Sequence, residues 1–233
     1  MSLLSAYRRS IILLDKLCFF VYIRRFEVVG REHVPPEGPL ILASNHLNNA
    51  DAPAVALAVP RHPTYMAKRE MIGWPIIGPA FRIFGAFPVS RGQGDLSALR
   101  AAVEVVRRGE MLVMFPEGTR TRTGGLERGH SGTGLIGLRT GAPILPVAIT
   151  GTEAITWPWI FLKPRSVRHL KVTIGEPFHL PPVARINSEA ATHATELIMR
   201  RIAALLPPQY RGIYAAVEGE AKQDAPAEAK RVY

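Results

Sequence analysis

Residues 39–51 read PLILASNHLNNAD, which is a short apolar run followed by a polar turn and an acidic residue. The run at 39–44 is bounded by glycine and proline on one side, as is typical of a buried strand. Asn48 and Asn49 favour a turn, and Pro53 suits the first turn of a helix. The segment therefore predicts a strand that leads through a loop into a helix.

The same alternation of apolar runs and helical patterns extends along the chain in both directions. It predicts a single α/β domain over residues 26–215, with a mixed or largely parallel sheet covered by helices. Residues 216–233 are polar and rich in alanine, and we expect them to be a disordered tail. The expected strands are 26–30, 39–44, 64–67, 86–89, 111–115, 144–149 and 170–174, and the expected helices are 52–59, 75–84, 96–108, 132–140 and 189–206.

Four residues are expected to mark helix ends. Asp95 and Ser188 carry side-chain oxygens that can accept hydrogen bonds from the first free N–H groups of a helix. Gly109 and Gly141 follow helical patterns and suit the left-handed residue that ends a helix.

Composition limits the class of protein. The 233 residues hold 29 Lys and Arg against 19 Asp and Glu, a net charge of +10, which favours an anionic partner such as nucleic acid, a membrane surface or a phosphorylated substrate. The basic residues form no block of the kind that marks a nucleic-acid arm, and we expect no nucleic-acid partner. The single cysteine, Cys18, excludes a disulfide framework and a cysteine-based zinc cluster, and it fits a reducing compartment.

His46 and Asp51 are candidates for acid–base chemistry. A neutral imidazole is the usual general base near pH 7, and a carboxylate on its other nitrogen fixes the tautomer. In one continuous helix a separation of five residues would place the two side chains about 140° apart. They can meet only if His46 lies on the loop and Asp51 enters the next helix. The alternative is that Asp51 caps a helix and His46 is an exposed loop residue.

Two further segments end expected strands with an arginine. Residues 115–120 read FPEGTR, and residues 85–92 place Arg91 after a strand. Ligands of α/β sheets gather outside the carboxyl ends of the strands, and the planar guanidinium suits a phosphate. Two such arginines beside a His–Asp pair would form a site for an anionic substrate with a base next to it. The alternative at 115–120 is a strand-ending turn with a solvated Glu–Arg pair.

Taken together, these segments resemble the conserved blocks of the glycerolipid acyltransferases of the 1-acylglycerol-3-phosphate O-acyltransferase type. Four blocks occur in the order that this family has, and the similarity covers roughly residues 26–180. They are the pattern N-H-x4-D at 45–51, GAFPVSR at 85–91, FPEGTR at 115–120 and APILPV at 142–147.

The resemblance implies a direct acyl transfer. His46 would be the general base that takes the proton from an acceptor hydroxyl, and Asp51 would orient and polarise it. The oxygen would then attack the thioester of acyl-CoA or acyl carrier protein, with no covalent acyl-enzyme. No metal and no cofactor other than this co-substrate is expected.

The resemblance also implies the acceptor site. Arg91 and Arg120 would hold the acceptor's phosphate, and Glu117 with Gly118 would shape the acceptor pocket. Glu117 would accept hydrogen bonds from a glycerol hydroxyl or orient Arg120. An oxyanion stabiliser is expected, but the sequence does not identify it.

The chain departs from the family pattern at some positions. His130 stands where the family often has a lysine, and it either replaces this phosphate contact or has no role. Leu47 and Asn48 replace a frequent glutamine and serine beside the base, which would fit a different acceptor. Residues 132–137 also match a dinucleotide-binding G-x-G-x-x-G, but a polar loop instead of a strand precedes them. We interpret these glycines as close packing of a helix against the sheet.

Two segments favour contact with a membrane. Residues 11–23 are apolar with arginines on both sides, which suits either an interfacial helix or a helix packed on the core. Residues 157–162 are aromatic and apolar and precede Lys163 and Arg165, as in a membrane anchor or an ordinary buried loop. No cleavage site follows the first segment, so secretion is not expected. We expect a peripheral or monotopic protein on the cytoplasmic face of the cell membrane.

The resemblance implies the synthesis of phosphatidic acid from 1-acylglycerol-3-phosphate in phospholipid biosynthesis. The acceptor can instead be glycerol-3-phosphate, another lysophospholipid or a lyso-aminolipid. From other classes, a lipid-thioester hydrolase and a non-catalytic binder of anionic lipids remain as alternatives. The sequence does not give the acyl-chain length, the regiochemistry or the oligomeric state.

Overall fold

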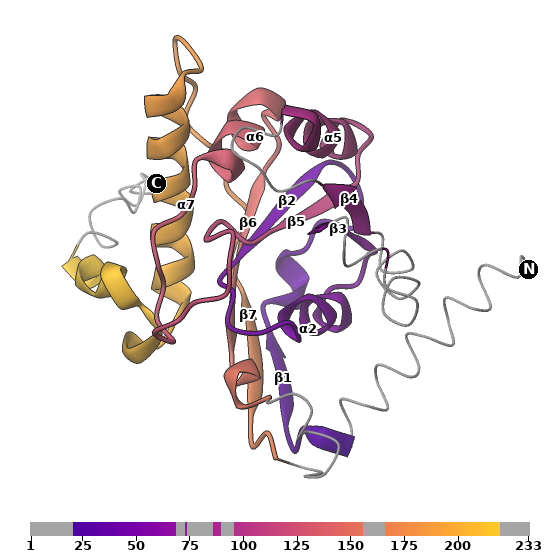
Figure 1. The fold of residues 1–233 in the computed structure, drawn as a ribbon, viewed down its shortest axis with the longest axis vertical. Helices are drawn as coiled ribbons and strands as arrows, with labels where there is room; N and C mark the ends of the chain where they lie inside the picture. The colour runs from indigo at the N-terminus through magenta and orange to yellow at the C-terminus, as the bar shows by residue number, and fades with distance from the viewer. Residues whose placement is uncertain (1–20, 69–72, 74–85, 90–95, 156–165, 220–233) are drawn as a thin grey trace, which may run out of the picture.

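The protein is described from a computed structural model, which covers residues 21–68, 73, 86–89, 96–155 and 166–219 (Figure 1). Its seven strands form one sheet in the order β1-β7-β6-β2-β5-β3-β4. All neighbouring strands are parallel except β6 and β7, which are antiparallel. The predicted mixed, largely parallel sheet is confirmed. The strands are β1 (Phe26–Val29), β2 (Leu40–Ser44), β3 (Pro63–Lys68), β4 (Ala86–Val89), β5 (Met111–Met114), β6 (Ile144–Thr150) and β7 (Leu170–Ile174).

Helices cover both faces of the sheet, with α2 on one side and α5, α6 and α7 on the other (Figure 1). Successive side chains of a strand point to opposite faces, so Leu40 and Leu42 of β2 pack towards α2, whereas Ile41 and Ala43 pack towards the other three helices. The helices are α2 (Asp51–Ala58), α5 (Leu96–Arg107), α6 (Gly132–Thr140) and α7 (Ser188–Leu205), with 3-10 turns η1 (Arg31–His33), η2 (Thr152–Ala154), η4 (Pro208–Tyr210) and η5 (Gly212–Gly219).

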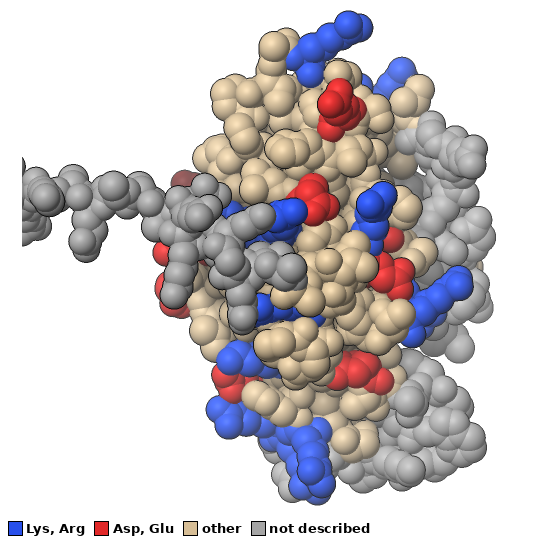
Figure 2. Space-filling view, turned by 90° about the vertical axis from the view of Figure 1, so that its left-hand side faces the viewer, with Lys and Arg blue, Asp and Glu red and all other residues tan. Residues whose placement is uncertain are grey.

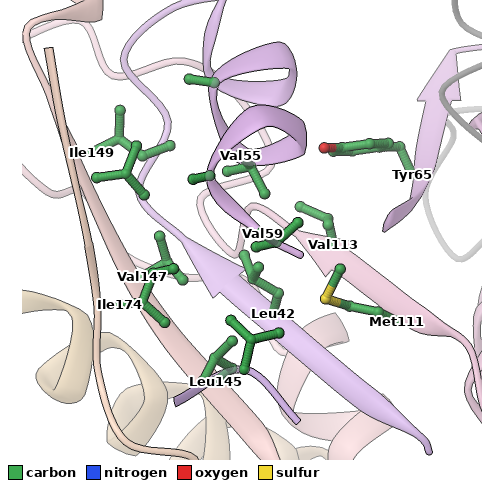
Figure 3. Close-up of a cluster of buried hydrophobic side chains, with 14 of the residues drawn as sticks. Leu42, Val55, Val59, Tyr65, Met111, Val113, Leu145, Val147, Ile149 and Ile174 are labelled. Atoms are coloured by element: carbon green, nitrogen blue, oxygen red, sulfur yellow. The ribbon is translucent and has the colours of Figure 1, made fainter. Parts of the chain in front are cut away.

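The core on the α2 side fixes the start of this helix relative to the strands. Val55 of α2 packs among Leu42, Val113 and Val147, which come from three neighbouring strands (Figure 3). Each such side chain contributes about 1.5–3 kcal/mol when it is fully buried. Since α2 begins directly after the loop that follows β2, this packing also fixes that loop.

On the other face, α6 and α7 approach closely because α6 contains glycines. A Cβ added at Gly134 would lie 2.3 Å from the carbonyl oxygen of Ala191, and one added at Gly137 would lie 2.6 Å from Leu180 Cδ1. These glycines therefore allow close packing of the helix, as predicted, but Gly134 packs against α7 instead of the sheet. Gly137 does approach the sheet, since its added Cβ would lie 3.2 Å from Cδ1 of Ile144.

Most expected elements are present, and one predicted cap is wrong. Asn187 caps α7, because its side-chain oxygen accepts the N–H of Ala190 at 2.8 Å, whereas Ser188 is already the first helical residue. Gly109 and Gly141 end their helices at φ +79° and +65°, as expected. The helix expected at 75–84 and the cap at Asp95 lie outside the described residues, as do 157–162.

The apolar helix predicted at residues 11–23 can be compared with the structure only at its last residues, because the described part of the chain begins at residue 21. Ile23 is buried in the core on the α2 side and forms an isolated bridge with Val167. The N–H of Arg24 donates to the Val167 carbonyl at 2.9 Å. The rest of the segment lies outside the described residues, so the interfacial helix stays a prediction. None of the helices in the described part of the chain is long and apolar enough to cross a bilayer.

Part of the positive charge is structural. Arg61 donates to the carbonyls of Pro35, Gly38 and Gly109 at 3.2, 2.7 and 3.1 Å and so ties together the turns before β2 and after α5. On the face that carries α7, Lys and Arg are interspersed with Asp and Glu (Figure 2). The net charge of +10 is therefore not gathered into one block on this face.

Candidate active site

His46 and Asp51 meet in the way that the sequence requires. His46 lies on the loop after β2, and Asp51 is the first residue of α2, so the chain turns between them. Nδ1 of His46 lies 2.8 Å from Oδ2 of Asp51. The Asp51 side chain does not cap α2, because its oxygens accept from the loop and from Thr152. The alternative of a capping aspartate and an independent histidine is therefore wrong.

Asp51 is a completely buried carboxylate, at 0% exposure, with four hydrogen-bond donors. Oδ2 accepts from Nδ1 of His46 and from the N–H groups of Leu47 and Asn48, at 2.7 and 2.8 Å. Oδ1 accepts from Oγ1 of Thr152 at 2.5 Å. These donors replace the water that a buried charge loses. Because Asp51 can only accept, the proton of His46 belongs on Nδ1, which leaves Nε2 as a free base.

The imidazole of His46 is held on its face as well as at its edge. It stacks on the Phe115 ring, with centroids 4.2 Å apart and an interplanar angle of 23°. The side chain is 18% exposed, so a part of it is accessible from outside. Phe115 directly follows β5, whose neighbour β2 leads to His46. The ring contact therefore joins the first and third sequence blocks.

Glu117 fixes the backbone of the site. Its Oε1 accepts the N–H of His46 at 2.9 Å, and its Oε2 accepts the N–H of Glu127 at 3.0 Å. Burial raises the pKa of the Glu117 carboxyl above its usual value, and the two N–H donors offset part of that rise. Glu117 and Arg120 are both described residues, and they make no ion pair with each other. The expected contact of Glu117 with a glycerol hydroxyl stays a prediction.

The loop after β5 lies against the His46 loop. The N–H of Thr121 donates to the carbonyl of His46 at 2.8 Å, so the backbone that carries the exposed Arg120 lies against the His46 loop. Gly118 has φ +68°, and a Cβ there would lie 2.9 Å from Cδ2 of His130. The turn therefore requires glycine, and His130 lies over it, at the edge of the site.

Arg91 lies outside the described residues, but the strand before it is placed. β4 is parallel to β3 at the end of the sheet, and β5 and β3 separate it from β2. At ~4.8 Å per strand, the carboxyl ends of β2 and β4 are about 14 Å apart on the same edge. The contact of Arg91 with a phosphate stays a prediction.

Several site residues were not found from the sequence because they act at long range. The amide of Asn45 extends the pairing of β2 and β6, since it donates to the carbonyl of Ile149 at 2.9 Å and accepts its N–H at 2.7 Å. Asn48 donates to the carbonyl of Ile155 at 2.9 Å, so its side chain is engaged within the protein. Thr152 reaches Asp51 across 101 residues of sequence. Asn45 carried a signal as part of the first block, and Asn48 as a turn former, but Thr152 carried none.

The arrangement can remove a proton from a substrate hydroxyl. It offers a histidine whose Nε2 has no hydrogen-bond partner among the described residues, a buried carboxylate behind it and an exposed arginine on the adjoining loop. Within the described residues, no three His, Cys, Asp or Glu side chains are grouped as a metal site would need.

The fold and the site define an α/β enzyme with a His–Asp pair at the carboxyl edge of its sheet. Residues 25–150 match the Acyltransferase family. The chain belongs to this family and is an O-acyltransferase.

Curated relatives and a solved structure agree with this assignment. The chain is 29% identical over 179 residues to the 1-acyl-sn-glycerol-3-phosphate acyltransferase of Bacillus subtilis, covering 76% of this chain and 85% of that one. It is 29% identical over 170 residues to the protein of that name from Limnanthes douglasii, covering 72% and 57%. It is 31% identical over 116 residues to the lyso-ornithine lipid O-acyltransferase of Pseudomonas aeruginosa, covering 49% and 44%.

The fold is that of the 1-acyl-sn-glycerophosphate (LPA) acyltransferase PlsC from Thermotoga maritima. The TM-score is 0.67, with 24% sequence identity, and the similarity covers 85% of this chain and 79% of that chain.

Proposed function

We propose that the protein transfers a fatty acyl group from acyl-CoA or acyl carrier protein to the free hydroxyl of 1-acylglycerol-3-phosphate and so forms phosphatidic acid for phospholipid synthesis. The observation that carries this proposal is the 2.8 Å contact of His46 Nδ1 with buried Asp51, which leaves Nε2 as the base. The loop that carries Arg120 lies against the His46 loop. The names of the Bacillus and Limnanthes relatives support the choice of acceptor.

The chemistry follows from the protonation of His46. Nε2 takes the hydroxyl proton as the acceptor oxygen attacks the thioester carbonyl, and the imidazolium that forms is stabilised by Asp51. A C–O bond forms, the C–S bond breaks, and the imidazolium returns the proton to the departing thiolate. A thioester is already activated, so this step needs no bound metal or cofactor.

The acceptor site lies where the two loops meet. Arg120 is exposed in the position that Thr121 fixes against the His46 carbonyl, and it would bind the acceptor phosphate together with Arg91. Gly118, with His130 above it, would border this pocket.

A lyso-aminolipid is the second candidate acceptor. The lyso-ornithine lipid O-acyltransferase of Pseudomonas aeruginosa is 31% identical over 116 residues, which is similar to the 29% identity of the 1-acyl-sn-glycerol-3-phosphate acyltransferases. Such an acceptor has no phosphate for Arg120 to bind. The two candidates therefore differ in how they depend on this residue.

Lipid substrates also imply a place of action. We propose that the protein acts as a peripheral or monotopic enzyme on the cytoplasmic face of the cell membrane, where an anionic surface would attract its net charge of +10.

The test is a product analysis with mixed substrates. The purified full-length protein is given acyl-CoA and, in parallel, acyl carrier protein, with 1-acylglycerol-3-phosphate, glycerol-3-phosphate, another lysophospholipid and a lyso-aminolipid. We expect thiol release to match the formation of phosphatidic acid, and His46→Ala to abolish both. Thiol release without an acylated product would instead indicate a hydrolase. Vesicle binding without turnover, unchanged in His46→Ala, would indicate a lipid-binding protein.

A further inference from the structure

Thr152 carries a buried hydroxyl that the proposed chemistry does not use. It is 0% exposed and lies directly after the turn that ends β6. Its Oγ1 donates to Oδ1 of Asp51 at 2.5 Å. We infer that Thr152 is a positioning residue that acts through Asp51 to hold the imidazole of His46 in its base tautomer and orientation. This inference rests on the proposed role of His46 as the base.

The two oxygens of Asp51 are held by different parts of the protein. Oδ2 accepts three donors, all from residues 46–48 of its own loop. Thr152 is the single donor to Oδ1 within the described part of the chain, and it comes from the other side, at the end of β6. The carboxylate plane turns about the Cβ–Cγ bond, and this rotation moves both oxygens. The hydroxyl of Thr152 holds Oδ1 from a separate element, and so adds a second anchor against the rotation that would turn Oδ2 away from His46.

The turn that carries Thr152 is itself fixed. Gly151 has φ +95°, and a Cβ there would lie only 2.0 Å from the carbonyl oxygen of His169, so the turn lies directly against the start of β7. Oε2 of Glu153 accepts the N–H of Gly151 at 2.8 Å, and Oε1 accepts the hydroxyl of Tyr210 at 2.6 Å. Burial and the neighbouring Glu153 carboxylate raise the pKa of Tyr210 to about 12, so its hydroxyl stays a donor. The turn that carries Thr152 is therefore fixed by the start of β7 and by the Glu153–Tyr210 hydrogen bond, and this fixes the position from which Thr152 contacts Asp51.

The chain offers a matched control. Thr64 also donates its hydroxyl to a carboxylate, Oε2 of Glu110, at 2.9 Å, and it is only 9% exposed. It lies near the start of β3, at the opposite edge of the sheet from His46. Valine has nearly the shape of threonine without the hydroxyl. Thr152→Val and Thr64→Val therefore remove the same kind of hydrogen bond, with and without a connection to the base.

Kinetics separate positioning from a merely structural role. With the acceptor that the wild type uses, we expect Thr152→Val to lower kcat roughly 10–100-fold, as for other bonds that orient a functional ligand, with both KM values unchanged. Thr152→Ser keeps the hydroxyl and should restore most of kcat, and Thr64→Val should match the wild type. In an Asp51→Asn background, Thr152→Val should cause little further loss, because its effect passes through Asp51. Unchanged kcat in Thr152→Val, or a full additional loss in that background, would overturn the inference.

A spectroscopic measurement tests the same inference without turnover. The Nδ1 proton of His46, assigned in ¹⁵N-histidine-labelled protein by its loss in His46→Ala, reports the hydrogen bond to Asp51. We expect this resonance to shift in Thr152→Val and to stay in place in Thr64→Val and in Thr152→Ser. An unchanged resonance in Thr152→Val would contradict the inference. A wild type inactive with every donor and acceptor would contradict the proposed function alone, and the spectrum would still decide the role of Thr152.

Discussion

Two buried carboxyl groups stand beside His46 and act on different atoms of it. Asp51 meets the imidazole edge, while Glu117 accepts the backbone N–H. The first therefore controls where the proton lies, and the second controls where the residue lies. Arg120 differs from both, because it is exposed and makes no hydrogen bond or ion pair within the described residues. Its guanidinium is available to a ligand.

Replacing Arg120 tests the phosphate contact. We expect Arg120→Ala to raise the KM for 1-acylglycerol-3-phosphate about 10–100-fold, the value of a charge-assisted hydrogen bond of about 1.5–3 kcal/mol, with a smaller effect on kcat. Steady-state kinetics against the acceptor would measure it. Arg122→Ala is the control, since Arg122 is an exposed arginine of the same loop. An unchanged KM in Arg120→Ala would show that another group binds the phosphate, or that the acceptor has none.

At the level of elements, the site is a junction of two loops and one helix start. The loop after β2 and the loop after β5 are joined by Glu117, by the hydrogen bond from Thr121 to the His46 carbonyl and by the stacking of His46 on Phe115. Since β2 and β5 are parallel neighbours, both loops leave the sheet at the same edge. The packing of α2 on the sheet then brings Asp51 back to His46.

The raised pKa of Glu117 predicts how stability depends on pH. The folded state binds the proton of the Glu117 carboxyl more tightly than the unfolded state does, since the pKa of this carboxyl is about 4.5 in the unfolded chain and higher in the folded one. The contribution of Glu117 is therefore fully present below about pH 4.5 and is lost as the pH rises through the raised folded pKa. Denaturant unfolding of the wild type and of Glu117→Gln, from below pH 4.5 to neutral pH, would measure this contribution to the free energy of unfolding. We expect the stability of the wild type relative to the variant to fall as the pH rises, and the opposite trend would contradict the assignment.

The packing of α6 against α7 gives a second prediction at this scale. Gly134→Ala places a Cβ 2.3 Å from the Ala191 carbonyl oxygen and should destabilise the protein by about 1–3 kcal/mol through overpacking. Gly132→Ala in the same helix is the control, because nothing lies within 4 Å of its added Cβ. Thermal unfolding should show a lower Tm for the first variant only. Equal Tm values would mean that α7 can move away at little cost.

For the whole molecule, the N-terminal segment is the proposed link to the membrane. Ile23 is buried in the core, so a deletion must spare it to test membrane contact alone. We expect removal of residues 1–20 to lower the recovery of the protein with anionic vesicles and to leave its Tm close to that of the full chain. Sedimentation with vesicles and a thermal melt would measure the two effects. A truncated protein that is still recovered wholly with the vesicles would refute the anchor.

The arrangement of the whole sheet was only partly predictable. Alternating strands and helices indicated an α/β domain, and each described strand was expected close to its observed bounds. The strand order was not predictable, and neither was the antiparallel pairing of β6 with β7. These depend on contacts between distant segments, whereas local patterns report only the burial of each segment by itself.

The sequence by itself indicated most strands and helices, His46 and Asp51 as candidates, and the resemblance to acyltransferases, because each is carried by a short run such as 45–51 or 115–120. That the two side chains meet was decided by the structure. Only the tertiary structure decided what holds that pair. Thr152 reaches Asp51 across 101 residues, and Glu117 reaches His46 across 71. Thr152 lies in no local pattern, and the FPEGTR block indicated Glu117 as a site residue without its contact to the His46 backbone. These contacts appear only when the sheet brings the carboxyl ends of β2, β5 and β6 together.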